Sequence, residues 1–271
     1  MNKHSERPIG IFDSGIGGLT VANAIHHLMP DEQLIYFGDT AHLPYGDKSA
    51  EAIKSYSNKI AGFLMEMNCK AIVIACNTAS SVAFKSVQKL FHDKDLVINV
   101  IDPVVENVLS TGNISRVGII ATKRTIKSNI YAKKLKALQP GIEVASLATP
   151  LLAPMIEEGF FNNKISQTII NSYLSKPKLK NIESLILACT HYPLIEPEIN
   201  KFYKNKIKIV DSPQIVANRV KEILATKNLL RKTPGKEHHF FVSDYTGSFE
   251  QTSRIFFREK IKLELKNIWN T

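Results

Sequence analysis

Short apolar runs alternate with longer amphipathic stretches along most of the chain. The apolar runs hold four or five residues and are predicted as strands at 9–12, 34–37, 71–75, 97–101, 117–121, 185–188 and 207–210. Most are apolar throughout, which is typical of strands in a parallel sheet covered on both faces. Stretches of helical period are predicted as helices at 50–68, 80–92, 126–138, 165–174 and 214–227. This alternation predicts an α/β fold with mainly parallel sheets.

Three segments of the first half of the chain recur, in the same order, in the second half. Ile9–Asp13 matches Val117–Ala121 after 108 residues, Ile72–Thr78 matches Leu185–His191 after 113, and Val100–Pro103 matches Val210–Pro213 after about 109. Three pairs at nearly equal offset indicate two similar α/β domains. We expect the domains to face each other about a pseudo-twofold axis, with an active site in the cleft between them.

Length and composition set the class of protein. A chain of 271 residues suits two domains of modest size, and 44% hydrophobic with 22% charged residues predicts a well-packed soluble protein. Residues 1–7 are polar and no secretory signal follows them. The longest apolar runs are too short to cross a bilayer, so no membrane association is expected. The expected location is the cytoplasm.

The formal net charge is +10. Basic residues are dense at 176–180, 201–208, 227–236 and 258–266. These stretches are spread over several polar segments late in the chain, so we interpret them as solvated surface. A basic balance can also indicate a nucleic-acid partner, but none is expected here, and attraction of anionic small molecules is a further alternative.

The chain contains three cysteines, Cys69, Cys76 and Cys189. An odd, small number argues against a disulfide framework, and no pair has the C-x-x-C spacing of a zinc or redox site. Each is therefore either a buried apolar side chain or a catalytic thiol. Cys69 precedes a predicted strand and is interpreted as inert.

Cys76 and Cys189 each follow the end of an apolar strand, at equivalent places in the repeat. Ligands of open α/β sheets bind beyond the carboxyl ends of the strands. If the two halves face each other, the thiols meet across one cleft, which is the arrangement that a two-base proton transfer needs. Cys76 taken alone is better explained as a buried cysteine before an ordinary helix start, and only the equivalent place of Cys189 reverses this interpretation.

Neighbouring polar residues can bind an acidic ligand beside the thiols. Asn77 and Thr78 open the helix after Cys76, where free N–H groups suit a carboxylate. His191 stands two residues after Cys189. Asp13 and Ser14 end the first strand, before a glycine-rich turn whose spacing does not fit a dinucleotide fingerprint, and are expected to point at a ligand ammonium or at a thiol.

Three further segments contain candidate residues for ligand binding or catalysis. The amides near Tyr45 and Gly46 could bind a second carboxylate, although a structural turn explains that loop equally well. Thr122 and Thr125 offer two hydroxyls at the matching place in the second half. Glu157 and Glu158 lie in a predicted short helix, and one of them is expected to reach the cleft unless both are a solvated pair.

Together these residues resemble the aspartate/glutamate racemase superfamily, and within it the glutamate racemases. The resemblance is carried by D-S-G-I-G-G at 13–18, G-D-T-A-x-x-P-Y-G at 38–46, A-C-N-T-A-S at 75–80, A-T-x-x-T-I-x-S at 121–128, E-E-G at 157–159, C-T-H-Y-P-L at 189–194 and V-S-D-x-T at 242–246. It covers about residues 8–257. His42, Asp102, Thr149 and Ala188 stand where the family commonly has arginine, glutamate, cysteine and glycine.

The resemblance implies a cofactor-independent glutamate racemase with no metal site. Cys76 is then expected to act on D-glutamate with help from Asp13, and Cys189 on L-glutamate with help from His191; Glu157 completes the predicted catalytic set. The predicted substrate-binding residues are Asp13, Ser14, Tyr45, Gly46, Asn77, Thr78, Thr122, Thr125, Thr190 and His191.

The resemblance also implies the wider setting. The product D-glutamate would supply peptidoglycan synthesis, and a homodimer is expected. The first domain is predicted to comprise residues 1–98 plus 209–271, and the second residues 99–208. Two alternatives stay open: an aspartate or other amino-acid racemase of the same superfamily, and a basic binding protein without turnover.

Overall fold

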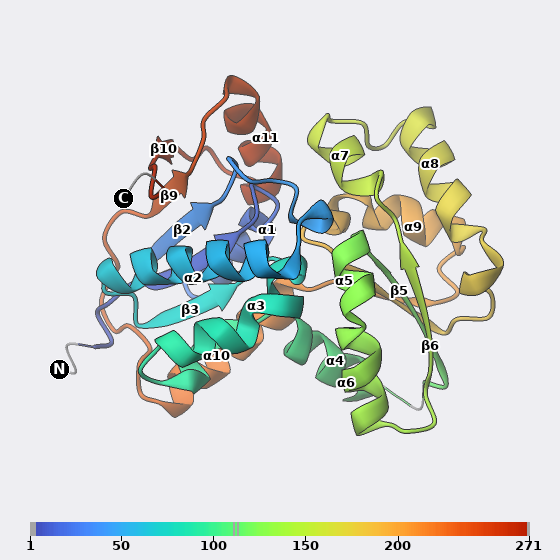
Figure 1. Ribbon diagram of the computed structural model, residues 1–271, viewed down its shortest axis with the longest axis horizontal. Helices are drawn as coiled ribbons and strands as arrows, with labels where there is room; N and C mark the ends of the chain where they lie inside the picture. Colours follow the sequence, from blue (N-terminus) through green and yellow to red (C-terminus); the bar gives the residue numbers. More distant parts are fainter. Residues whose placement is uncertain (1–3, 111, 113, 270–271) are drawn as a thin grey trace.

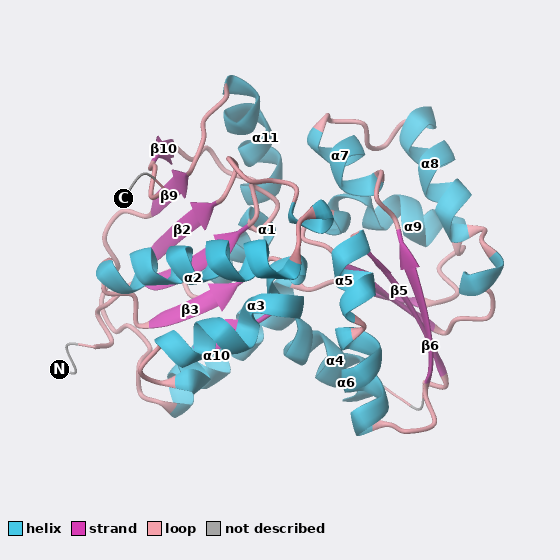
Figure 2. Cartoon of the chain, viewed as in Figure 1, coloured by secondary structure: helices cyan, strands magenta, loops and turns pink. Residues whose placement is uncertain are grey.

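A computed structural model describes residues 4–110, 112 and 114–269, and within these residues the strands form two parallel sheets (Figures 1 and 2). The first sheet has the order β10-β9-β2-β1-β3-β4. Its strands are β1 (Ile9–Asp13), β2 (Leu34–Gly38), β3 (Ala71–Ile74), β4 (Val97–Asn99), β9 (His239–Val242) and β10 (Leu263–Leu265). The last two come from the end of the chain, so the first sheet is discontinuous in sequence.

The second sheet has the order β6-β5-β7-β8. Its strands are β5 (Arg116–Ala121), β6 (Glu143–Ala148), β7 (Ser184–Ala188) and β8 (Lys208–Val210). This order repeats β2-β1-β3-β4 of the first sheet, so the sequence repeat corresponds to a repeat of topology. The predicted fold of two similar α/β units with parallel sheets is confirmed, while the domain boundaries stay a prediction.

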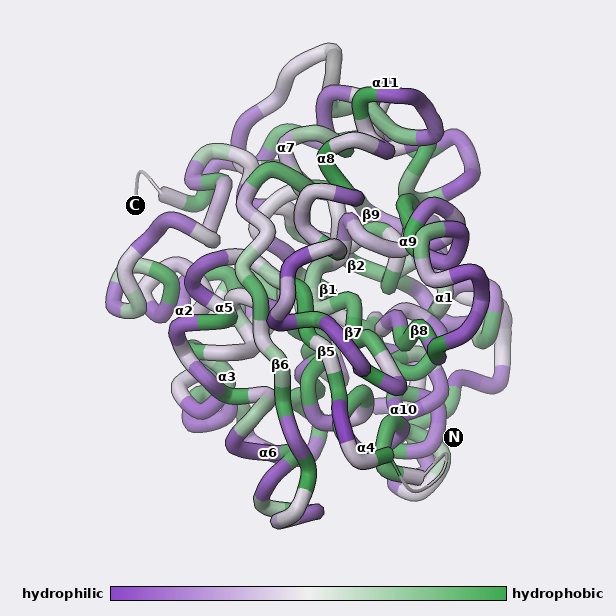
Figure 3. Tube along the Cα trace, turned by 90° about the vertical axis from the view of Figure 1, so that its right-hand side faces the viewer, coloured by the Kyte–Doolittle hydropathy of each residue, from purple (hydrophilic) through white to green (hydrophobic). Residues whose placement is uncertain are grey.

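Helices connect and cover the strands in both units. They are α1 (Leu19–Leu28), α2 (Ala50–Glu66), α3 (Asn77–Leu90), α4 (Ile101–Ser110), α5 (Lys123–Ser128), α6 (Ile130–Leu138), α7 (Leu152–Glu157), α8 (Lys164–Leu174), α9 (Glu196–Phe202), α10 (Pro213–Thr226) and α11 (Gly247–Phe257). In the first unit α2 packs on α3, and α1 packs on α10 and α11 (Figure 1). Outer helices such as α6 and α10 alternate hydrophobic and hydrophilic positions (Figure 3), as helices with one buried face should.

The predicted strands are all present, with small differences at their ends. The strand predicted to run to residue 101 ends at Asn99. The Asn99 side chain accepts hydrogen bonds from the backbone N–H groups of Ile101 and Asp102, at 2.9 and 3.0 Å. These bonds satisfy donors at a helix start, so the chain turns into α4 two residues earlier than the apolar run suggests.

The helix predicted at 126–138 is two helices. Asn129 has a left-handed backbone (φ 56°) and separates α5 from α6. Asparagine adopts this conformation more readily than most residues, and here it ends one helix and begins the next. The break redirects the chain, and α6 carries Tyr131 back toward the first unit.

The hydrophobic core follows the sheets. The strands β1, β2, β3 and β7 are buried at every position. In contrast, β6 is mostly half-buried, as an edge strand with a solvated face should be. Within the described part of the chain, no helix combines the length and the apolar character needed to cross a membrane.

Candidate active site

One cavity of about 270 Å³ lies between the two units and contains both candidate thiols. Its lining includes these predicted residues: Ser14, Tyr45, Gly46, Cys76, Asn77, Thr78, Thr122, Glu157, Cys189, Thr190 and His191. Gly15, Leu43, Pro44, Ala153 and Pro154 complete it. The predicted residues Asp13 and Thr125 lie behind this lining, both fully or almost fully buried. Cys69 is also buried but is not part of the cavity wall.

The first thiol stands at the carboxyl edge of the first sheet. Cys76 follows β3 and is the N-cap of α3, where its Sγ accepts a hydrogen bond from the Ala79 N–H at 3.4 Å. Its thiol donates to Ser14 Oγ at 3.6 Å. Burial raises the pKa of Cys76 to about 12, the Asp13 charge adds to this, and the bonds from Ala79 and Ser14 partly offset it. Cys76 is therefore a protonated thiol at neutral pH and can donate a proton.

Asp13 ends β1 on the strand next to Cys76, because Phe12 pairs with Ile74 in the parallel ladder. Its Oδ2 accepts a hydrogen bond from the Gly15 N–H at 3.1 Å, whereas its buried Oδ1 has no partner among the described residues. Burial raises the pKa of Asp13, and the His191 charge and nearby backbone N–H groups lower it in part. Asp13 is therefore a buried carboxyl group beside Cys76 that is harder to ionise than an exposed aspartate.

The second thiol has a different partner. Cys189 follows β7, and its Sγ lies 3.6 Å from His191 Nδ1. His191 Nε2 lies 2.8 Å from Glu157 Oε1. Burial lowers the pKa of His191, but the hydrogen bonds to Cys189 and Glu157 raise it by more, so that the pKa lies well above its ordinary value. These contacts favour the protonated ring, which would present a positive charge to the sulfur.

The loop at 39–46 is held by a buried carboxylate that the sequence did not single out. Asp39 is fully buried and accepts hydrogen bonds from Tyr45 Oη at 2.6 Å and from Ser243 Oγ at 2.8 Å. His42 Nδ1 lies 2.9 Å from its Oδ1. Asp39 thus fixes Tyr45 and Gly46 at the cavity wall. Its place in the G-D-T-A motif was the available signal, but a single acidic residue in a loop does not show what it contacts.

Hydroxyl groups link the two units beside the cavity. Thr78 Oγ1 lies 2.9 Å from Thr122 Oγ1 and 3.3 Å from Thr125 Oγ1, and the latter two lie 3.1 Å apart. Thr78 belongs to α3 of the first unit, and the other two flank the start of α5 in the second. Thr125 therefore supports the wall through its neighbours instead of lining it.

Glycines bring the units into close approach at two points. A Cβ on Gly17 would lie 2.5 Å from His191 Cε1 and 2.7 Å from Thr190 Oγ1. A Cβ on Gly46 would lie 2.9 Å from Thr122 Cβ. Only glycine leaves room at such distances, so the glycine-rich turn of the first unit can pack directly on the histidine of the second.

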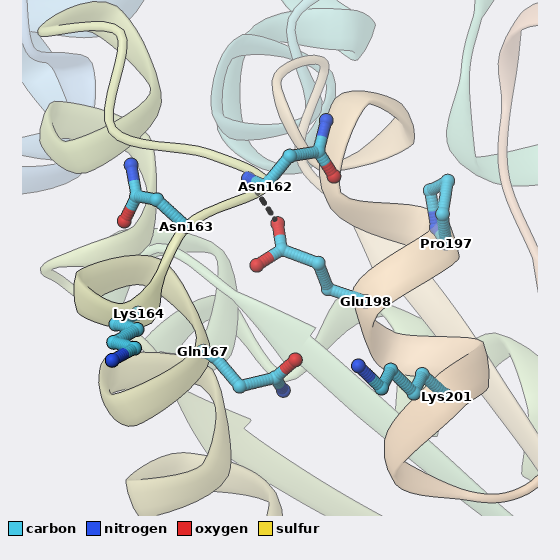
Figure 4. A pocket seen from close by; sticks show the side chains of 7 residues that line it. All are labelled: Asn162, Asn163, Lys164, Gln167, Pro197, Glu198 and Lys201. Atoms are coloured by element: carbon cyan, nitrogen blue, oxygen red, sulfur yellow. Dashed lines mark hydrogen bonds between the residues drawn. The ribbon is translucent and has the colours of Figure 1, made fainter.

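A larger cavity of about 450 Å³ lies away from the thiols, between the start of α8 and α9 (Figure 4). Its buried carboxylate, Glu198, already accepts hydrogen bonds from the Asn162 N–H at 3.0 Å and from Ser166 Oγ. Among the described residues there is no group of three or more histidine, cysteine, aspartate or glutamate residues placed to hold a metal ion. The cavity that contains Cys76 and Cys189 is therefore the candidate active site, because two thiols and His191 line it.

The fold and this site define an α/β enzyme class with a paired-thiol cleft, and comparison with known proteins gives its family. The model of the Asp/Glu/Hydantoin racemase family matches residues 19–220, and the chain belongs to this family. A relative named glutamate racemase, from Geobacter metallireducens, is 41% identical over 256 residues, which is 94% of each chain.

Solved structures agree. A glutamate racemase from Francisella tularensis, determined in complex with D-glutamate, superposes with a TM-score of 0.92 at 39% identity, covering 98% of this chain and 100% of the other. An aspartate racemase from Picrophilus torridus gives a TM-score of 0.58 at 19% identity, covering 80% of this chain and 94% of the other, which shows a shared fold.

Proposed function

We propose that this protein is a glutamate racemase, which interconverts L- and D-glutamate by moving the α-proton between Cys76 and Cys189. The observation that carries the proposal is the placement of the two thiols, one from each unit, in the wall of a single cavity. A racemase with two bases needs a proton acceptor on one face of the α-carbon and a donor on the other. The names and the high identity of the relatives support glutamate as the substrate.

The geometry supports one route for L-glutamate. Protonated His191 stabilises a thiolate at Cys189, which removes the α-proton from one face of the substrate. The Cys76 thiol then gives its proton to the opposite face, which yields D-glutamate and leaves a thiolate at Cys76. The N–H of Ala79 and Ser14 stabilise that thiolate, and transfer of the proton on Cys189 back through solvent to Cys76 restores the starting state.

Two groups of donors fit the substrate carboxylates. The first is the start of α3, where Asn77 and Thr78 border the cavity and backbone N–H groups favour an anion. The second is the Tyr45–Gly46 segment held by Asp39. Two separate carboxylate positions favour a dicarboxylic amino acid over alanine.

A racemisation assay tests this proposal. Loss of circular dichroism should be fast with L-glutamate, and slow or absent with L-aspartate and L-alanine measured in parallel. A faster reaction with L-aspartate than with L-glutamate would show that the substrate is aspartate and would favour an aspartate racemase of the same superfamily. Absence of turnover with every amino acid, together with binding of glutamate, would favour a binding protein.

The reaction is proposed to need no cofactor, because proton transfer between two thiols uses only groups of this chain. Extensive dialysis against a chelator should leave the rate of racemisation unchanged. A loss of activity that pyridoxal phosphate or a divalent metal ion restores would contradict this part of the proposal.

The location, oligomeric state and domain division of the protein are inferred as well. We infer a cytoplasmic enzyme that supplies D-glutamate for peptidoglycan, acts as a homodimer, and divides into the domains 1–98 plus 209–271 and 99–208. The expectation of D-glutamate supply follows from the resemblance to glutamate racemases. Sedimentation of the purified protein tests the dimer directly.

A further inference from the structure

A tyrosine of the second unit contacts the first residue after the Cys76 thiol. Tyr131 on α6 donates a hydrogen bond from its hydroxyl to Asn77 Oδ1 at 2.6 Å. Both side chains are buried, with 3% of each residue exposed. The two residues are 54 positions apart in the sequence and belong to different units, so this contact forms only when the units are apposed.

The other end of the same amide is unpaired. Asn77 Nδ2 is buried and has no hydrogen-bond partner among the described residues, although Asn77 lines the cavity between the thiols. Leaving a buried amide donor without an acceptor is costly, so proteins normally pair such groups. An unpaired donor in the wall of a ligand cavity is therefore best explained by an acceptor that the ligand brings, and a carboxylate oxygen is such an acceptor.

The hydroxyl of Tyr131 can act only as a donor to this amide oxygen. Burial raises the pKa of Tyr131, and the charges at Asp102 and Cys189 raise it further, so the phenol keeps its proton. The terminal torsion of an asparagine side chain is soft and roughly two-fold, so packing alone specifies poorly which end faces a cavity. The hydrogen bond from Tyr131 holds Asn77 Oδ1 and leaves Nδ2 for another acceptor.

We propose that Tyr131 is a positioning residue for the racemase reaction: it orients Asn77 so that the amide Nδ2 donates a hydrogen bond to a carboxylate of the bound amino acid. This inference rests on the proposed function and deepens it. Tyr131 is not part of the cavity lining, so it acts through Asn77 and not by touching the substrate. Because the hydroxyl comes from the second unit, a binding group of the first unit is correctly oriented only when the units are together.

The test compares Tyr131→Phe with Tyr203→Phe. Tyr203 is a matched control, because its buried hydroxyl has no hydrogen-bond partner among the described residues. Tyr131→Phe should raise KM for both enantiomers about tenfold and change kcat by less than about threefold, as loss of a binding interaction common to ground state and transition state does. The rise in Tm caused by saturating D-glutamate should shrink in parallel. Tyr203→Phe should leave KM unchanged.

A double-mutant cycle separates positioning from a general structural role. In the background Asn77→Ala, adding Tyr131→Phe should leave KM and the D-glutamate-induced rise in Tm unchanged, because the group that Tyr131 orients is gone. Additive effects of the two substitutions would overturn the inference, as would a Tyr131→Phe variant with unchanged KM. If the wild-type protein racemises glutamate and Tyr131→Phe has the same KM and kcat, this inference is refuted and the proposed function stands. Wild-type protein that neither racemises nor binds glutamate would refute the proposed function, and the inference with it.

Discussion

The two thiol sites occupy equivalent positions in the repeat but have opposite electrostatic surroundings. Cys76 lies beside the carboxyl group of Asp13 and has a pKa raised to about 12, which favours the protonated thiol. Cys189 lies beside His191, whose pKa is raised well above its ordinary value. The repeat therefore places two thiols at equivalent positions, while the side chains next to each thiol differ.

The difference arises at matched positions of the repeat. Asp13 at the end of β1 corresponds to Ala121 at the end of β5, so only the first unit supplies a carboxyl group there. Thr78, two residues after Cys76, corresponds to His191, two residues after Cys189, so only the second unit supplies an imidazole there. The two thiols therefore have different neighbours, a carboxyl group beside Cys76 and an imidazole beside Cys189.

Removing either thiol is expected to have the largest effect. Cys76→Ala and Cys189→Ala should each lower racemisation by at least about a thousandfold, since positioned acid–base groups contribute about 10²–10⁴-fold and neither face has a second base. Steady-state rates by circular dichroism measure this. Cys69→Ala is the control and should be close to wild type. An inactive Cys69→Ala beside an active Cys76→Ala would show that the thiols are wrongly assigned.

Serine at each thiol position is expected to separate the two faces, with a smaller effect of roughly a hundredfold in the impaired direction. Cys189→Ser should slow proton abstraction from L-glutamate more than from D-glutamate, and Cys76→Ser should do the reverse. Elimination of a leaving group from β-substituted glutamate analogues measures single abstractions. Equal losses for both enantiomers in both variants would contradict the assignment of faces while leaving the racemase intact.

The smallest expected effect comes from Glu157→Gln, which changes only the second site. Its hydrogen bond raises the pKa of His191, so the substitution should lower that pKa, and the ring should lose its proton at lower pH. The kcat/KM for L-glutamate should then fall at lower pH than in wild type and be reduced roughly tenfold on the alkaline side, because a hydrogen bond to a charged group is lost.

Two controls accompany this pH profile. Glu158→Gln removes the adjacent, exposed carboxylate and should leave the profile of L-glutamate unchanged. Cys76, which does not contact Glu157, should still abstract a proton from D-glutamate analogues at a rate close to that of wild type. If kcat/KM of Glu157→Gln for L-glutamate falls at the same alkaline pH as in the wild type, His191 does not set the charge at Cys189.

The sequence predicted the sheets better than the contacts between them. Fully buried strands such as β1 and β7 are uniformly apolar and could be recognised, whereas β6 is half-exposed, and β9 and β10 are short strands in a polar tail. Cys76 and Cys189 could be predicted to line one cavity, because strand ends converge in this fold. Asp39 and Tyr131 could not, because their partners depend on how loops and units meet in three dimensions.

The strand order of the first sheet constrains how the chain is assembled during synthesis. β9 pairs with β2, yet it is translated only after every strand of the second sheet. The four-strand orders β2-β1-β3-β4 and β6-β5-β7-β8 can both form before this, while the free edge of β2 waits for residues 239–242. An unpaired strand edge invites pairing with other chains. The edge of β2 that β9 covers is therefore unpaired for most of synthesis, and this is the period in which the growing chain is most exposed to pairing with other chains.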